Sequence, residues 1–322
     1  MQTRIPPRSI FWSCAAFRSY TAHLPVRTKP TAIRCVRSPR ENKSWLPDYA
    51  LYIILKEANI GAEWYDWADE DLKLHRPEAV AKAMEEQAET VLFMEFIQYT
   101  FFEQWKKIKK YANSKGVEII GDLPMYVARN SADVWANRHL FDLTEDGEPK
   151  NVAGVPPDYF SEFGQKWGNP LYNWAEMKKD GYRWWMDRLG ACFKLFDAVR
   201  IDHFRAFSAY WAVPAEAETA KEGQWLDGPK TDFFDAVNRT FKNPKIIAED
   251  LGIIDDGVID LLEKNAAAVH ARDAVCVYGR QRQHAHAAQL PGKTAWPIPA
   301  RTITTPCSAG CGRHSRMSAS MR

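Results

Sequence analysis

Cysteine is scarce over most of this 322-residue chain. The stretch 41–270 contains one of the six cysteines, Cys192, and the other five lie in the two ends. A single thiol cannot build a disulfide framework, and so low a cysteine content is typical of proteins from a reducing compartment. We therefore predict a cytoplasmic protein.

Acidic residues are nearly missing from both ends of the chain. Residues 1–40 hold eight basic residues and no acidic one, and residues 271–322 hold eight basic residues and the single acid Asp273. The stretch between them has 27 basic and 40 acidic residues, a net charge of −13. We therefore divide the chain into a basic segment 1–40, a central domain 41–264 and a basic tail 265–322, and predict disorder in both flanks.

Three origins are open for the basic segment 1–40. Its composition is typical of an organellar transit peptide, but Pro6, Pro7, Pro25 and Pro30 interrupt any amphipathic helix. A basic arm could also bind nucleic acid, but no recognition module accompanies it, so we predict no nucleic-acid partner. Translation of out-of-frame DNA is the favoured origin, and the nucleotide sequence around codons 30–45 and 264–275 tests it.

The tail favours the same origin. Cys307, Cys311 and His314 resemble one half of a zinc site, but no second half accompanies them, so we predict no metal. Long apolar runs are missing as well: no 18 consecutive residues are apolar, which excludes a membrane-spanning helix and a membrane partner. The sequence also lacks a glycine-rich phosphate loop and any internal repeat.

Helices and strands alternate in the central domain. Apolar residues at helical intervals predict helices over 44–56 and 76–110, with the aromatic-rich part 91–105 of the second packed inward. Two further helices are expected over 175–193 and 232–241.

Three short apolar runs predict parallel strands over 117–122, 197–202 and 245–249. The stretch 121–174, rich in Pro, Gly, Asn and aromatics, is too long for an ordinary connection and is expected to be functional.

Each of these apolar runs ends at a carboxylate: Asp122, Asp202 and Glu249. Acids at the carboxyl ends of barrel strands point into the mouth of a (β/α) barrel, where catalysis takes place. A pair of them can cleave an acetal, since one attacks the sugar carbon while the other donates a proton. Arg200 lies two residues before Asp202 and is expected on the same strand face, where its charge keeps that carboxylate ionised.

Five ordered motifs carry a resemblance to a known family. Their sequences are Gly-Asp-Leu-Pro-Met-Tyr-Val from 121, Val-Pro-Pro-Asp-Tyr-Phe-Ser from 155, Gln-Lys-Trp-Gly-Asn-Pro-Leu-Tyr-Asn-Trp from 165, Arg-Ile-Asp-His-Phe-Arg from 200 and Ala-Glu-Asp-Leu-Gly from 248. Over about 41–264 the chain resembles the 4-alpha-glucanotransferases, also called amylomaltases or disproportionating enzymes, which have α-amylase-type (β/α)8 barrels.

The resemblance implies a retaining transfer of α-1,4-glucan segments to the 4-hydroxyl of glucose or an oligosaccharide. By motif position, Asp202 is the expected nucleophile and Glu249 the expected general acid and base. Retention predicts carboxyl groups about 5–5.5 Å apart. No cofactor is implied, because acid–base chemistry on an acetal needs none, and the expected partner is an α-1,4-glucan or malto-oligosaccharide.

Further residues are expected to bind the glucan. The predicted substrate-binding set is Arg200, His203, Asp122, Tyr159, Phe160 and Trp167. For Asp122 a structural or hydroxyl-binding role is favoured over chemistry, and His203 could either bind sugar or brace its loop. Aromatic rings stack on sugar faces, but core packing is the expected role of Trp184, Trp185 and Trp211.

The chain also departs from the family pattern. The resemblance implies a third catalytic acid in a Thr-His-Asp-type motif, yet no acid follows Asp273, and the early barrel strands are missing before Glu41. We therefore predict an α/β fold, a partial (β/α)8 barrel with a helical insertion that does not close, and low activity. The alternative is a non-catalytic glucan-binding remnant; a hydrolase of the α-amylase type is less favoured. Incubation with maltotriose separates these hypotheses.

Overall fold

The computed structural model describes residues 42–159, 161–249, 255–265 and 269–271. These residues fall within one compact unit, 1–275. The predicted basic segment 1–40, Phe160 and nearly all of the predicted tail 265–322 lie outside the described residues.

A parallel sheet of four strands carries the ends at which the predicted acids stand. Its order is β1 (Ile120–Leu123), β4 (Ala198–Ile201), β7 (Ile246–Ala248) and β8 (Val269–Ala271). The three predicted strands are confirmed, and a fourth strand, β8, was not predicted because its alanine-rich sequence is not typical of a strand. The described strands form an open sheet and no closed barrel.

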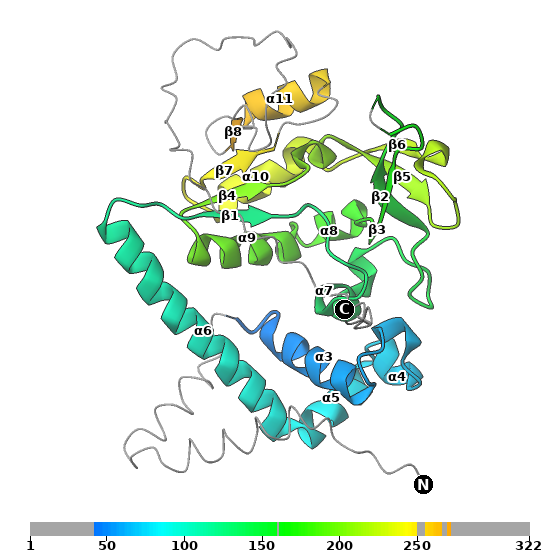
Figure 1. Ribbon diagram of the computed structural model, residues 1–322, viewed down its shortest axis with the longest axis vertical. Coiled ribbons are helices and arrows are strands. Elements are labelled where there is room, and N and C mark those ends of the chain that lie inside the picture. Colours follow the sequence, from blue (N-terminus) through cyan, green and yellow to red (C-terminus); the bar gives the residue numbers. More distant parts are fainter. Residues whose placement is uncertain (1–41, 160, 250–254, 266–268, 272–322) are drawn as a thin grey trace, which may run out of the picture. The chain divides into compact units, whose positions relative to one another are not determined.

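Helices precede the second, third and fourth strands of this sheet. They are α8 (Trp174–Lys179) and α9 (Arg183–Leu195) before β4, α10 (Lys230–Thr240) before β7, and α11 (Asp256–Lys264) before β8. One helix was predicted where α8 and α9 stand, and Tyr182, with φ of +62°, separates them. Figure 1 shows α9 running beside β1 and β4, with which it is in contact.

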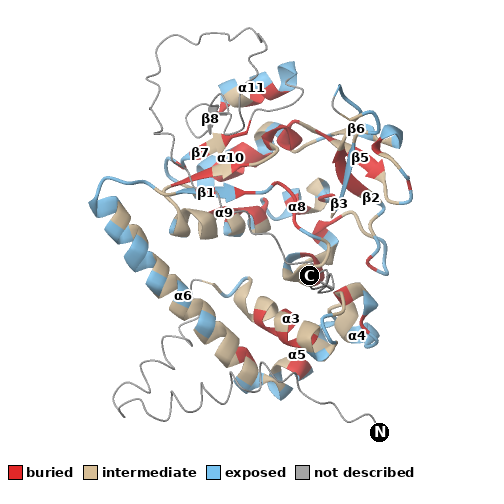
Figure 2. Ribbon diagram, viewed as in Figure 1, coloured by how far each residue is buried: buried red, intermediate tan, exposed pale blue. Residues whose placement is uncertain are grey.

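The two faces of the parallel sheet differ in burial. Leu123, Ile201 and Ala248 share one register position and are buried, as expected of a face covered by helices. Asp122, Arg200 and Ile247 share the neighbouring position, and none of the three is buried. The exposed residues of β1 are visible in Figure 2. Because side chains alternate along a strand, the second face carries the polar groups of the site.

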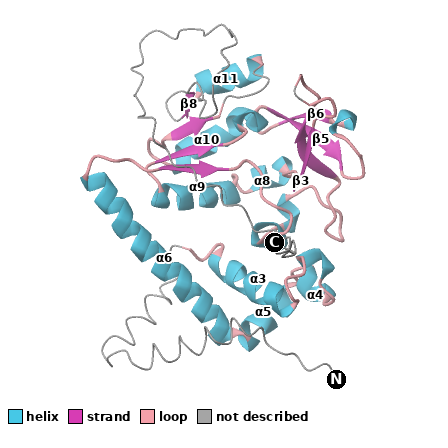
Figure 3. Ribbon diagram, in the orientation of Figure 1, coloured by secondary structure: helices cyan, strands magenta, loops and turns pink. Residues whose placement is uncertain are grey.

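A second, antiparallel sheet takes two of its strands from the long stretch 121–174 and two from the part that follows β4. Its order is β3 (Gln165–Pro170), β2 (Asn151–Val155), β5 (Ala209–Pro214) and β6 (Gln224–Asp227), drawn apart from the parallel sheet in Figure 3. The short helices η3 (Phe204–Phe207) and η4 (Ala220–Glu222) precede β5 and β6. A Cβ on Gly154 would lie 2.3 Å from the Gln165 carbonyl oxygen, so only glycine allows β3 to pair this closely with β2.

Helices dominate the amino-terminal part of the described chain. They are α3 (Leu46–Ala58), η1 (Trp64–Asp66), α4 (Glu70–Lys73), α5 (Pro77–Glu86) and α6 (Ala88–Ser114). The single helix predicted over 76–110 is interrupted at Gln87. The inward packing predicted for 91–105 is wrong, since Val91 is the one buried residue of α6 and Phe101 is 47% exposed.

Several hydrogen bonds attach α6 to the segment that leads into β4. The Trp105 indole donates to the Leu195 carbonyl oxygen over 2.7 Å, and the Lys109 ammonium donates to the Phe196 carbonyl oxygen over 2.7 Å. The Phe196 ring in turn covers β1, where a Cβ on Gly121 would lie 2.1 Å from it. Glycine at 121 therefore sets how closely this ring approaches the first strand.

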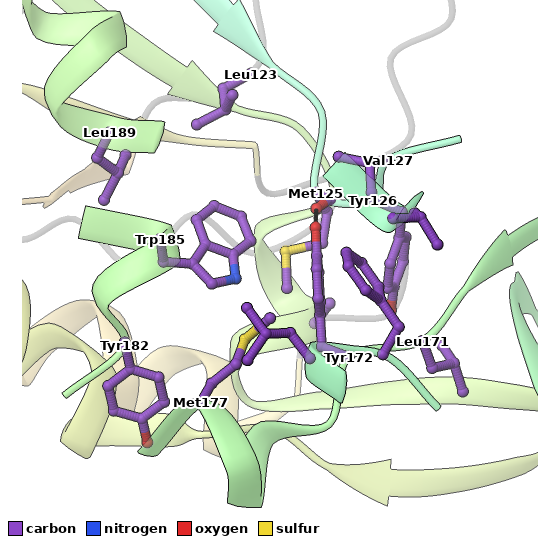
Figure 4. Close-up of a cluster of buried hydrophobic side chains, with 14 of the residues drawn as sticks. Leu123, Met125, Tyr126, Val127, Leu171, Tyr172, Met177, Tyr182, Trp185 and Leu189 are labelled. Carbon is purple, nitrogen blue, oxygen red and sulfur yellow. Dashed lines mark hydrogen bonds between the residues drawn. The ribbon is translucent and has the colours of Figure 1, made fainter. Parts of the chain in front are cut away.

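Aromatic residues form much of the core. Trp185 is fully buried, with its ring edge-on to those of Tyr172 and Phe207. The short helices α7 (Ala132–Ala136) and η2 (Arg138–Leu140) contribute Trp135 and Leu140 to the same cluster. The Tyr172 ring lies in the same cluster, and its hydroxyl donates to the Met125 carbonyl oxygen over 2.7 Å, the dashed line in Figure 4. The predicted core role of Trp185 is confirmed, while Trp184 and Trp211 pack against core clusters from partly exposed positions.

Among the described helices, none is long and apolar enough to cross a bilayer.

Candidate active site

Two carboxylates stand at the ends of adjacent parallel strands. Asp202 follows β4 and its amide donates to the Leu123 carbonyl oxygen over 2.9 Å, while Glu249 follows β7 and its amide donates to the Ile201 carbonyl oxygen over 3.1 Å. Since Ile201 and Ala248 are register partners, Asp202 and Glu249 occupy the next position on their strands. Both are two residues beyond the Arg200 and Ile247 pair and so belong to the face that helices leave uncovered.

Arg200 joins two of the predicted acids. One terminal nitrogen of its guanidinium lies 2.6 Å from Asp122 Oδ1 and the other lies 2.7 Å from Asp202 Oδ1. Burial lowers the pKa of Arg200, but the hydrogen bonds and charges of Asp122 and Asp202 outweigh it, so that the pKa lies above its ordinary value. Arg200 was expected on the strand face of Asp202, and the short contact places it there.

Glu249 and Asp202 lie in different surroundings. The Asp202 side chain is 51% exposed, whereas Glu249 as a residue is 9% exposed. The backbone amide of His203 donates to Glu249 Oε2 over 3.0 Å. His203 has a left-handed backbone with φ of +55°, and its amide lies one residue beyond Asp202. The residue that follows Asp202 is therefore hydrogen-bonded directly to Glu249.

The side chain of His203 lies among aromatic rings. Its ring centroid is 4.9 Å from that of Trp167, which approaches edge-on, and 6.2 Å from that of Tyr126. Burial, followed by the charge of Arg205, lowers the pKa of His203 to about 4 although Asp202 opposes the shift. His203 is therefore neutral near pH 7. Its buried Nε2 has no hydrogen-bond partner in the part of the chain that the structure describes.

The predicted aromatic residues are only partly brought together. Trp167 belongs to β3, is 38% exposed and contacts His203, so it borders the carboxylates. Tyr159 is 97% exposed in the segment between β2 and β3. Phe160 follows it and lies outside the described residues.

Two features of the site were not foreseen. Tyr126 is buried and stacked on Tyr172 with centroids 5.8 Å apart, and burial raises its pKa well above the ordinary value. Arg205 is buried beside the turn that carries His203. Position in the motifs of the sequence could have pointed to both, since Tyr126 lies within the run from 121 and Arg205 ends the run from 200.

The arrangement suits acid–base chemistry on a neutral substrate. It offers one exposed carboxylate held by a guanidinium, one buried carboxyl group held by an amide, and a neutral imidazole, with aromatic rings alongside. Two carboxyl groups in unlike surroundings are what an acetal-cleaving pair requires. Among the described residues, no group of three His, Cys, Asp or Glu side chains could hold a metal ion; the Cys307 and Cys311 half-site lies outside them.

Comparisons with known proteins point to the same chemistry. A model of a family described as 4-alpha-glucanotransferase matches residues 22–272. The chain is 46% identical over 225 residues to the 4-alpha-glucanotransferase of Streptococcus pneumoniae serotype 4, and 49% identical over 224 residues to that of Aquifex aeolicus. Each alignment covers 70% of this chain but 45% or 46% of the relative, so the chain spans about half the length of these curated relatives.

A solved structure supports the same assignment. The amylomaltase from Streptococcus agalactiae in complex with acarbose is similar to this chain, with a TM-score of 0.68 and 35% identity. The match covers 76% of this chain and 52% of that one. The likeness confirms the predicted fold class, a partial (β/α)8 barrel whose described strands do not close.

Proposed function

Because the chain belongs to the 4-alpha-glucanotransferase family, we propose that its site serves the retaining transfer of α-1,4-glucan segments. The acceptor is the 4-hydroxyl of glucose or of an oligosaccharide. The observation that carries the proposal is the in-register placement of Asp202 and Glu249 at the ends of two adjacent strands. Groups so placed can reach one glycosidic bond from the same edge of the sheet.

Each carboxyl group has one role in the proposed reaction. The Asp202 carboxylate attacks the anomeric carbon, and the bond between that carbon and the glycosidic oxygen breaks. Glu249 gives its proton to the departing oxygen, then takes the proton of the acceptor hydroxyl as this attacks the glycosyl–Asp202 ester. The acceptor forms a new glycosidic bond with retained configuration, and Asp202 leaves as a carboxylate.

Arg200 fits this scheme as the residue that holds the nucleophile. Its contact of 2.7 Å with Asp202 is a charge-assisted hydrogen bond, which fixes the orientation of the carboxylate. The second contact, to Asp122, holds the guanidinium in place from the neighbouring strand. Asp122 itself, 68% exposed at its side chain, remains available to a sugar hydroxyl.

The remaining predicted residues are proposed to bind the glucan. Buried polar atoms are normally hydrogen-bonded, so the unpartnered Nε2 of neutral His203 favours sugar binding over bracing for that side chain. Trp167 offers a partly exposed ring beside it, and Tyr159 and Phe160 are proposed to extend the aromatic surface along the chain. The proposed partner is a malto-oligosaccharide, and the proposed location is the cytoplasm.

A second candidate, a non-catalytic glucan-binding protein, is favoured by a separate observation. The described parallel strands leave the sheet open. Incubating the purified chain with maltotriose separates the two candidates. The proposed transfer gives glucose together with longer oligosaccharides, whereas binding without new products supports the second candidate, and shorter sugars without longer ones indicate hydrolysis.

The matched control is Asp202→Asn, which keeps the size of the side chain but removes the nucleophile. We expect the transfer rate to fall by about three orders of magnitude or more. Binding of maltotriose, measured by calorimetry, is expected to persist. Equal product formation by both chains would contradict the role of Asp202.

A further inference from the structure

Arg205 is a buried cation next to the proposed catalytic pair. It is 4% exposed, and Glu249 is the other charged residue that is buried in the described part of the chain. Taking a guanidinium out of water costs several kcal/mol unless partners compensate it. We therefore expect the guanidinium of Arg205, three residues after Asp202, to have hydrogen-bond and charge partners.

The Arg205 side chain joins three segments. Its Nε donates to the Ala209 carbonyl oxygen over 3.3 Å, and a terminal nitrogen donates to Asp255 Oδ2 over 3.0 Å. The guanidinium carbon lies 4.0 Å from the centroid of the Trp225 ring. One side chain thus ties η3 to the start of α11 and to β6. Lysine could not replace it, because the three contacts use the planar, forked shape of the guanidinium.

The residues that Arg205 joins follow the two proposed catalytic residues, Asp202 and Glu249, in the sequence. Arg205 belongs to the turn that begins after Asp202, and the first residue of that turn, His203, donates its amide to Glu249. Asp255 is the first described residue after Glu249. The Arg205–Asp255 pair therefore fastens the segment that follows Glu249 to the turn whose amide holds Glu249.

We infer that Arg205 is a positioning residue: by holding this turn against α11, it keeps the His203 amide on Glu249 and sets the placement of Glu249 relative to Asp202. The inference rests on the proposed function for the roles of those two carboxyl groups. Arg205 acts through the turn and touches no reacting atom in this account.

The variant Asp255→Asn tests the inference with little risk to folding. Asp255 Oδ1 accepts from the Val258 amide over 3.0 Å and so caps α11, a role that asparagine fills equally well. Its Oδ2 faces Arg205 and would become an amide nitrogen, a donor that cannot accept from the guanidinium. Asp256→Asn is the matched control, because it removes the same charge from the exposed next position of the same helix.

Exchange of the His203 backbone amide with solvent, followed by NMR on the full chain, is the first measurement. Since a hydrogen bond contributes about 0.5–1.5 kcal/mol, we expect Asp255→Asn to raise the exchange rate roughly 2- to 10-fold. Asp256→Asn should leave the rate unchanged. Arg205→Lys should raise it as well, and the double variant should raise it no further than either single variant.

Maltotriose transfer is the second measurement. Misplacement of Glu249 should lower kcat in Asp255→Asn while KM changes little, because the error concerns the reacting bond and not the outer sugar contacts. An unmodified chain that yields no transfer products would overturn the proposed function but leave the exchange test intact. Equal His203 exchange in Asp255→Asn and Asp256→Asn would overturn the positioning role, whatever the chain does with maltotriose.

Discussion

Acid should destabilise this protein through His203 in particular. The pKa of His203 in the folded chain is about 4, lowered by burial and then by the charge of Arg205, against about 6.5 in an unfolded chain. The fold thus prefers the neutral ring. The stability that this contributes is fully present above pH 6.5 and is lost as the pH falls toward 4.

The variant His203→Asn isolates this contribution. Asparagine does not titrate in this range and accepts a left-handed backbone, which position 203 requires with φ of +55°. From the two pKa values, the parent chain should lose about 2 kcal/mol of unfolding free energy between pH 7 and pH 5 beyond what the variant loses. All other titrating groups cancel in the comparison.

Urea unfolding at the two pH values, followed by tryptophan fluorescence, measures the difference. Parallel pH dependence in the two chains would refute the reasoning, because His203 would then titrate alike in the folded and unfolded states. A larger loss in the variant would contradict the predicted sign.

Three further predictions concern packing and binding. Gly121→Ala places a Cβ 2.1 Å from the Phe196 ring and should lower the unfolding free energy by about 1–3 kcal/mol, part of which Phe196→Leu should restore. Urea midpoints measure both effects, and an unchanged midpoint in Gly121→Ala would contradict the contact. Trp185→Ala removes a fully buried ring and should cost about 3–5 kcal/mol in the same assay, where a loss below 1 kcal/mol would contradict its core position. Trp167→Ala should weaken maltotriose binding by about 1 kcal/mol, a fivefold rise in Kd by calorimetry, while unaltered binding would exclude this ring from the sugar surface.

Parallel strands could be predicted where an apolar run in the sequence forms the buried face of the strand. β4 and β7 are apolar on the covered face, and each is followed by a carboxylate. The apolar run predicted the strand, and the carboxylate after it predicted a residue of the site. β8 (Val-His-Ala) follows three alanines, and alanine has a low strand propensity. β5 was not predicted because it pairs with β2, about 60 residues earlier, and pairing of that kind leaves little local signal.

Burial was harder to predict than helix formation. The periodicity over 88–114 specifies a helix, and α6 is one, but which of its faces is covered depends on segments elsewhere in the chain. Phe101 is accordingly exposed although it lies in an aromatic-rich part of the helix. The helix break at Gln87 also has no glycine or proline to mark it.

Some contacts of the site could be predicted from the sequence and others could not. Arg200 could be assigned from the alternation of side chains along β4, and its contacts with Asp122 and Asp202 follow from the register. The contact of Arg205 with Asp255 could not be predicted, because Asp255 lies 50 residues further along the chain and no local pattern joins the two residues. The separation of the two catalytic carboxyl groups stays a prediction of the retaining mechanism.

Capture of a glycosyl group on Asp202 tests the central claim most directly. In Glu249→Gln, a maltosyl fluoride donor can still glycosylate Asp202, because fluoride leaves without a proton from Glu249, but release to an acceptor lacks its general base and is slow. Mass spectrometry of the intact chain and of its peptides should then show one added maltosyl group, on the peptide that contains Asp202, and none in the Asp202→Asn, Glu249→Gln double variant. An adduct on another residue, or an equal adduct in the double variant, would contradict the account.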